Sequence, residues 1–131
     1  MDRQERLYDV LGELLYAIAK ADGVIQKEET DALNRLLSNH AYGNEIKWSF
    51  DYESTKDSSV EEIYNRVINF CHGHGPAAEY DEFIKAMKVI AEAANGVEDT
   101  ESNIINSFSK DLLERFERDT QRLRRFERED Y

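Results

Sequence analysis

The sequence of 131 residues predicts an all-α protein, folded as a single compact helical domain over residues 1–131. Apolar residues recur at spacings of three and four in several segments, which is the period of one helix face. An internal repeat supports the same fold class. An apolar helix, a stop at Asp22-Gly23 and a second helix opening with carboxylates return over residues 89–105, where Asn95 stands 73 positions after Asp22. These two helix–acidic turn–helix units indicate a duplicated helical domain.

The first two helices are expected on either side of the first acidic turn. The first runs from Arg3 to Asp22, and Gly12 inside it would let a neighbouring helix approach closely. Its apolar stripe consists of Leu7, Val10, Leu11, Leu14, Leu15 and Ile18. The second helix is expected from Lys27 to Ser38, with its buried face formed by Leu33, Leu36 and Leu37.

Residues 40–58 are expected to be irregular. Ile46, Trp48 and Phe50 alternate with polar residues, as in a strand, but no second strand is evident to pair with them. We interpret this stretch as an ordered loop whose aromatic side chains cover the core, with a short extended piece as the alternative. A loop of this length is uncommon in a compact domain and often has a function.

Three more helices are expected after residue 58. Ser58 and Ser59 precede glutamates at the capping-box spacing and start the third helix, which the glycine-rich run 72–76 ends. The fourth helix ends at Asn95-Gly96, and the fifth begins near Asp99. Beyond residue 116 the apolar stripe thins. Residues 117–131 are therefore expected to form a charged helical extension that projects past the core or packs on a partner, a second copy of the chain (a homodimer) included.

The charge of the chain excludes several kinds of partner. The net charge is −11, and it lies wholly in residues 1–109, because residues 110–131 carry as many basic as acidic side chains. Such a body repels nucleic-acid phosphates and anionic lipid headgroups, and attracts cations or basic protein surfaces. The apolar runs are far shorter than the roughly 20 residues of a membrane span. With no apolar signal region at its start and a single Cys71, the chain is expected to be cytoplasmic.

The acidic turns are the candidate metal sites. Asp22 ends one helix and Glu28 and Glu29 open the next, so their carboxylates are expected to converge on a hard divalent cation, whether calcium, magnesium, manganese or zinc. In the second copy Asn95 replaces the aspartate, while Glu101 matches Glu28. The same carboxylates also have a purely structural explanation, because acidic residues in a first helical turn are favoured by the helix dipole.

No motif for catalysis is found, so the protein is not expected to be an enzyme. The chain holds no G-x-S-x-G, no P-loop and no dinucleotide fingerprint. Cys71, His72 and His74 have the chemistry of soft-metal ligands. However, Cys71 lies on an apolar helical stripe, which favours a place in the core.

The element LYAIAKADGVIQKEE, residues 15–29, resembles the signature of the tellurite-resistance TerB family, which includes a related domain of DjlA-type membrane co-chaperones. That pattern is an apolar helix ending in Ala-Asp-Gly, a short hydrophobic step and two glutamates, repeated once. The first copy matches through Ala21, Asp22, Gly23, Val24, Glu28 and Glu29. The second copy matches through Ala94, Gly96, Val97 and Glu101, and departs from the pattern at Asn95. The resemblance covers residues 5–116.

This resemblance implies an all-helical, non-catalytic scaffold or interaction protein of a bacterial stress response. It also implies divalent metal at the acidic turns and protein partners associated with the inner face of the membrane. Because Asn95 replaces the aspartate, a second metal site of equal strength is not expected. The alternatives are a metal-dependent enzyme with clustered carboxylates and a plain protein-interaction domain without an ion site. Buried, closely paired acids in a deep apolar pocket would favour the enzyme.

Overall fold

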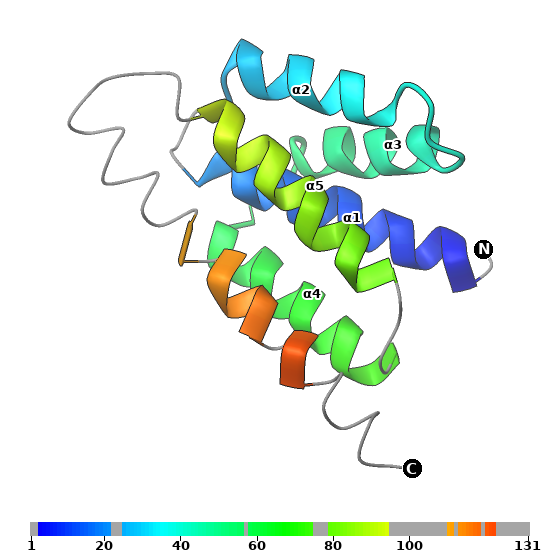
Figure 1. The fold of residues 1–131 in the computed structure, drawn as a ribbon, viewed down its shortest axis with the longest axis vertical. Helices are drawn as coiled ribbons and strands as arrows, with labels where there is room; N and C mark the ends of the chain where they lie inside the picture. The colour runs from blue at the N-terminus through cyan, green and yellow to red at the C-terminus, as the bar shows by residue number, and fades with distance from the viewer. Residues whose placement is uncertain are drawn as a thin grey trace.

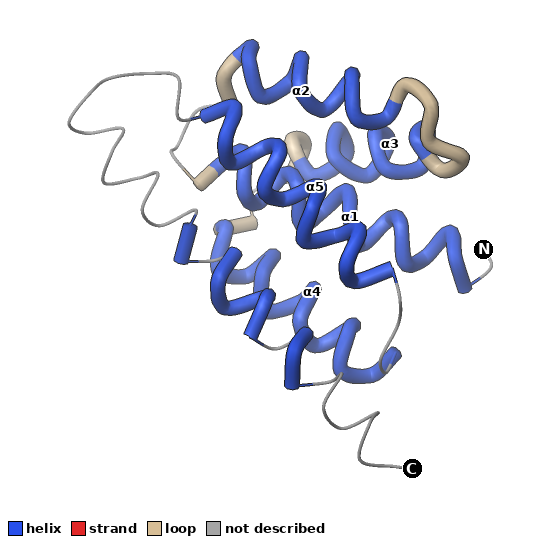
Figure 2. The backbone as a smooth tube through the Cα atoms, in the orientation of Figure 1, coloured by secondary structure: helices blue, strands red, loops and turns tan. Residues whose placement is uncertain are grey.

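The computed structural model describes residues 3–21, 25–56, 58–74, 79–94, 110, 111, 113–118 and 120–122. These residues form helices and short connections, with no strand among them (Figure 2). The helices are α1 (Arg3–Lys20), α2 (Lys27–Leu37), α3 (Gly43–Glu53), α4 (Val60–His74) and α5 (Glu79–Ala94). The described residues between 110 and 122 are also helical. The prediction of an all-α fold is confirmed.

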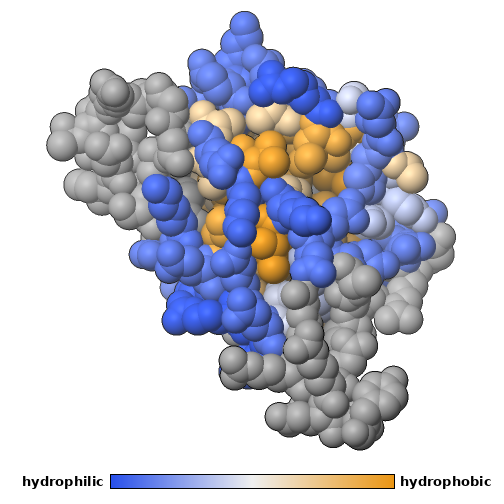
Figure 3. Space-filling model, viewed as in Figure 1, coloured by the Kyte–Doolittle hydropathy of each residue, from blue (hydrophilic) through white to orange (hydrophobic). Residues whose placement is uncertain are grey.

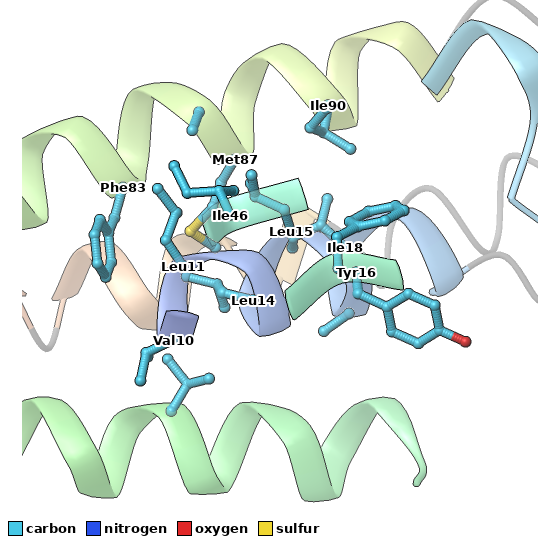
Figure 4. Packing of buried hydrophobic residues seen from close by; sticks show 14 of the residues in the cluster. Val10, Leu11, Leu14, Leu15, Tyr16, Ile18, Ile46, Phe83, Met87 and Ile90 are labelled. Carbon is cyan, nitrogen blue, oxygen red and sulfur yellow. The ribbon is translucent and has the colours of Figure 1, made fainter. Parts of the chain in front are cut away.

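Helix α1 lies at the centre of the bundle. Helices α3, α4 and α5 pack around it, whereas α2 packs on α5 and α3 (Figure 1). Figure 4 shows Phe83, Met87 and Ile90 of α5 reaching toward Leu11 and Leu15 of α1. Burial extends around α1 and includes Leu7, Tyr8, Val10, Leu14, Tyr16, Ala17, Ile18 and Ala19. The predicted apolar stripe of the first helix is therefore buried, together with residues on its other faces.

The offset of the internal repeat relates the buried faces of α1 and α5. At an offset of 73 positions, four buried residues of α1 correspond to buried residues of α5. The corresponding pairs are Leu7 and Tyr80, Val10 and Phe83, Leu14 and Met87, and Ala17 and Ile90. Leu15, by contrast, corresponds to the exposed Lys88, because one face of α5 is in solvent. The first helices of the two units thus share one buried face. The acidic turns, at residues 22–24 and 95–100, lie outside the described residues.

Helices α1 and α3 cross at Gly12. A Cβ atom at this position would stand 2.5 Å from the carbonyl oxygen of Ile46 and 2.7 Å from Cβ of Ser49. Both distances are shorter than van der Waals contact, so only glycine lets the two backbones come this close. The Ser49 hydroxyl donates a hydrogen bond of 2.5 Å to the carbonyl oxygen of Asp9, one turn away. The close approach predicted at Gly12 is confirmed.

The prediction of an irregular stretch over residues 40–58 is wrong in its middle, where α3 forms. The buried residues of this helix have the spacing of one helical face and are Gly43, Ile46, Ser49, Phe50 and Glu53. Ser49 and Glu53 are polar, so the apolar residues of this segment alone do not show the helical period. Trp48, expected to cover the core, is 59% exposed. Packing against α1 thus decides the conformation of a segment whose apolar residues alternate.

The start of α4 agrees with the predicted capping, because the Ser59 hydroxyl accepts a hydrogen bond of 3.1 Å from the backbone N–H of Glu62. Helix α4 then continues to His74, past the start of the break expected at residues 72–76. A glycine such as Gly73 weakens a helix by only about 1 kcal/mol, which does not end it.

The C-terminal helical residues pack on the bundle. Leu113, Phe116 and Thr120 are buried, and the rings of Phe116 and Phe83 stack with their centroids 6.4 Å apart. The packing therefore reaches into the segment 117–131 that was expected to project past the core. Among the described residues, every helix falls short of the length and apolar character that crossing a membrane requires.

We expect Gly12→Ala to lower the free energy of unfolding by about 1–3 kcal/mol, measured by urea denaturation, because α3 must shift to accommodate the methyl group. The gain in helix propensity, about 1 kcal/mol, offsets only part of this loss. The matched control is Gly73→Ala in α4, where a Cβ would meet nothing within 4 Å. This control should be neutral or stabilising by up to about 1 kcal/mol. Equal effects at the two positions would contradict the close crossing.

Candidate functional site

The predicted metal ligands of the first acidic turn differ in their surroundings. Glu28 is exposed. Glu29 is 1% exposed, and its Oε1 accepts a hydrogen bond of 3.0 Å from the backbone N–H of Gln26, the residue before α2. Glu29 therefore satisfies a backbone donor at the helix start. Asp22 and Glu101 lie outside the described residues, and the part of the chain that is described holds no group of three potential metal ligands.

Cys71 is part of the core, as its place on the apolar stripe indicates. It is buried, and burial raises the pKa of its thiol to about 12. The Tyr80 hydroxyl donates a hydrogen bond of 3.0 Å to the backbone carbonyl of Cys71. The side chains of His72 and His74 lie outside the described residues. Such a thiol is protonated at neutral pH and is a weak nucleophile.

A cavity of about 210 Å³ lies between α2 and α5, with α1 and α3 at its base. Figure 3 shows apolar side chains gathered near the middle of this face of the molecule, framed by hydrophilic residues. The apolar walls of the cavity are formed by Leu11, Leu36, Leu37, Ile46, Ala86 and Val89. Three polar side chains complete the lining, and these are His40, Glu82 and Lys85. An apolar cavity with a few polar groups is the usual form of a small-molecule site.

A connected hydrogen-bond network around Glu82 lies at the edge of the cavity. The Tyr8 hydroxyl donates a hydrogen bond of 2.8 Å to Oε2 of Glu82. The ring Nε2 of His40 makes a short contact with Oε1 of the same carboxylate. Burial, followed by the neighbouring Glu82, raises the pKa of Tyr8 above its ordinary range, so the phenol keeps its proton at neutral pH. Glu82 is thus fixed by two donors.

The hydrogen bonds of His40 set its tautomer. The backbone N–H of Tyr42 donates a hydrogen bond of 2.9 Å to Nδ1 of His40, so Nδ1 carries no proton. The ring proton is therefore on Nε2 and is donated to Glu82. Tyr8 stacks on Tyr42 at 4.6 Å between centroids and meets the His40 ring edge-on at 5.0 Å. These contacts hold the donors of the network in place.

A second polar cluster lies where α1, α3 and α4 meet. Glu53, whose side chain is fully buried, accepts a hydrogen bond of 2.9 Å from Nη2 of Arg66, and the Lys56 ammonium is 3.6 Å away. Glu13 lies 3.7 Å from Nε of Arg66. Burial raises the pKa of Glu13, and Glu53 adds to the rise, while Arg66 opposes it. This carboxyl pair shares no residue with the lining of the cavity.

Helix α3 presents two exposed aromatic side chains. Trp48 is 59% exposed and Tyr52 is 46% exposed, and their rings stack at 5.1 Å with an interplanar angle of 7°. The Lys56 ammonium lies 4.6 Å from the centre of the Tyr52 ring, which is the distance of a cation–π contact. We call Trp48 and Tyr52 the aromatic pair.

Carboxylates lie beside the aromatic pair. Asp51 is exposed on α3 next to Tyr52, and Glu45 stands one turn before Trp48. Burial raises the pKa of Asp9 on α1, and the negative charges of Glu45 and Glu5 raise it further. This mutual repulsion means that the carboxylates of Asp9, Glu5 and Glu45 lie close together, whereas Asp51 pairs with the Lys47 ammonium at 2.6 Å.

None of the residues that form the cavity network was among the predicted site residues. His40 and Glu82 are 42 positions apart, and Tyr8 and Glu82 are 74 apart, so no local spacing links them. The aromatic pair, in contrast, has a local signal, because residues four apart share one face of a helix. Comparisons with models of protein families, with curated proteins and with solved structures found no match for this chain. The resemblance to TerB therefore rests on residues 15–29 and 94–101 alone.

We expect Glu13→Gln to become more stable relative to the parent protein as pH rises from 4 to 7. The raised pKa of Glu13 means that the folded state holds its proton more tightly than the unfolded state does. The parent protein therefore loses stability as pH rises from the unfolded pKa, about 4.3, through the folded pKa, and the glutamine variant escapes this loss.

The measurement is thermal unfolding of both proteins across this pH range, with an expected difference of a few degrees near neutrality. Glu28→Gln is the matched control, since it removes the same charge from an exposed position. A parent-to-variant difference that is constant with pH would contradict a raised pKa at Glu13.

Proposed function

We propose that this protein is a non-catalytic interaction protein whose α3 face binds a basic segment of a partner protein. The observation that carries this proposal is the exposed, stacked aromatic pair. Tryptophan and tyrosine are enriched at protein interfaces, where they contribute a large share of the binding energy. Trp48 and Tyr52 leave much of their apolar surface in water, which a partner would cover.

The chemistry around the aromatic pair favours a cationic partner. Lys56 already rests on the Tyr52 ring, so the pair attracts a cation within its own chain. Arginine and lysine side chains of a partner would stack on the remaining aromatic surface in the same way. The carboxylates of Glu45 and Asp9 would add attraction, although Asp51 already pairs with Lys47. The net charge of −11 would speed the encounter.

The placement of the carboxyl pair supports a non-catalytic role. Metal-dependent catalysis with paired acids needs them in the wall of a pocket that admits substrate. Glu13 and Glu53 lie apart from the cavity, and the Glu53 side chain is fully buried against Arg66. A metal-dependent enzyme stays as the alternative function.

The resemblance to TerB adds finer proposals. It favours a role in a bacterial stress response, in the cytoplasm, with a membrane-associated protein as the partner. It also favours a divalent cation at the first acidic turn, held by Asp22 and Glu28. Glu29 is the weaker candidate ligand, because its Oε1 already accepts the Gln26 backbone N–H.

We expect an arginine-rich peptide to change the fluorescence of Trp48, the single tryptophan of the chain, so that the signal reports on this site alone. Tyr52→Ala should weaken binding about tenfold, the effect of losing one aromatic anchor at an interface. A peptide of the same length made of glycine and serine should leave the fluorescence unchanged.

The matched control for the variant is Val89→Ala, which removes another exposed apolar side chain from a different helix. It should bind the peptide as the parent protein does. If calorimetry shows that Trp48→Ala binds the peptide with parental affinity, charge alone accounts for binding and the aromatic pair has no part in it.

For the cation, we expect divalent metal to raise the melting temperature by mass action, because the unfolded chain has no converged ligands. Asp22→Asn and Glu28→Gln should each remove most of this gain, while Glu101→Gln should change it little. The measurement is a thermal melt with calcium, magnesium, manganese and zinc in turn. An unmoved melting curve at millimolar metal would show that the carboxylates of the turn have a structural role only.

A further inference from the structure

We propose that the cavity between α2 and α5 binds a small organic amine, with its apolar body among the leucines and its ammonium group on Glu82. This site is separate from the α3 face, so it adds a ligand-binding activity to the interaction proposed above. Three properties of the site support this ligand: the size of the cavity, the ionisation of its polar groups and their fixed orientation.

The cavity has room for an apolar group the size of a six-membered ring. A cavity of about 150 Å³ lined by aliphatic and aromatic side chains takes up benzene, and this one measures about 210 Å³. Its walls are side chains of four helices, among them the fully buried Leu11 and Ile46. A ring placed there would exchange water for apolar contact, at about 25 cal/mol for each Å² of apolar surface removed from water.

The walls of the cavity are almost wholly apolar, and the partly exposed Glu82 carboxylate stands at its edge. Tyr8 and His40 both donate to Glu82, one to each oxygen, which is the arrangement that a deprotonated carboxylate requires. His40 carries its proton on Nε2 and accepts the Tyr42 N–H on Nδ1, so this ring is neutral. Tyr8 is neutral as well. The two partners therefore orient Glu82 without cancelling its charge.

A carboxylate has about four lone-pair positions, so Glu82 has capacity for a further donor. Its side chain is 40% exposed, which leaves it open to a ligand. Among the described residues, no lysine or arginine forms an ion pair with Glu82, although Lys85 also lines the cavity. An ammonium group supplies the donors and the positive charge that this carboxylate lacks, and the acidic body of the protein favours a cation over an anion.

Lys85 makes the sign of the ligand charge testable. This exposed residue also lines the cavity, and its positive charge would repel an amine but attract a carboxylate. Neutralising Lys85 should therefore strengthen the binding of an amine and weaken the binding of an acid. The two ligand types thus give opposite results with one variant.

The test is a titration of the full chain at neutral pH with cyclohexylamine, cyclohexanol and cyclohexanecarboxylate, followed by amide chemical shifts. So small a ligand is expected to bind in the millimolar range, so each titration extends to about 10 mM. Cyclohexylamine should shift residues of the lining, such as Leu36 and Ala86. Cyclohexanol should bind about tenfold more weakly, the difference between a charged and a neutral hydrogen bond.

Glu82→Gln should reduce the affinity for cyclohexylamine to that for cyclohexanol. Glu92→Gln, which removes the same charge from an exposed position of α5 outside the cavity lining, should leave it unchanged. Lys85→Gln should tighten amine binding. Because the three ligands and the Lys85 variant test the proposal without altering the network, a Glu82 variant that fails to fold does not block the test.

Two results would overturn the proposal. If none of the three ligands shifts the lining residues, the cavity is not a ligand site. If cyclohexanecarboxylate binds more tightly than the amine, and Lys85→Gln weakens it, the cavity selects anions through Lys85. The α3 face is tested with a peptide and Trp48 fluorescence, so failure of either proposal is distinguishable from failure of the other.

Discussion

The close crossing of α1 and α3 at Gly12 is the contact that positions the other parts of the fold. It brings the Ile46 carbonyl and the Ser49 side chain against the backbone of α1, where a methyl group would not fit. Since α1 contacts all three of them, α3, α4 and α5 each take their place relative to this one helix. Helix α2 then packs across α5 and α3, and the cavity lies beneath it.

Several buried polar groups of this acidic protein have a polar partner close by. Glu53 lies against Arg66, and Ser49 donates to the Asp9 carbonyl at the helix crossing. Glu29 accepts a backbone N–H at the start of α2. The arrangement around Glu82 is different, because its partners are a neutral tyrosine and a neutral histidine. A carboxylate held by two such donors beside apolar walls distinguishes the cavity from these structural clusters.

Much of the fold is predictable from the sequence, because the stripes of α1, α4 and α5 are apolar and regular. Helix α3 was missed for a physical reason. Its buried face includes the polar Ser49 and Glu53, while the apolar Trp48 faces solvent. The pattern of apolar residues in this helix therefore does not follow the pattern of buried residues. The cavity was also missed, because His40 and Glu82 come together only through the packing of α2 and α5. Predicting such a site requires the tertiary structure.

The most direct test of the account is a nuclear Overhauser experiment at the crossing of α1 and α3. The proximity of Gly12 to Ser49 and Phe50 predicts cross-peaks from the Gly12 α-protons to the Ser49 β-protons and to the Phe50 amide proton. These signals, together with helical connectivities through Gly43–Glu53, would establish that α3 is a helix packed on α1. Their absence in a folded sample would contradict the crossing and, with it, the cavity that depends on it.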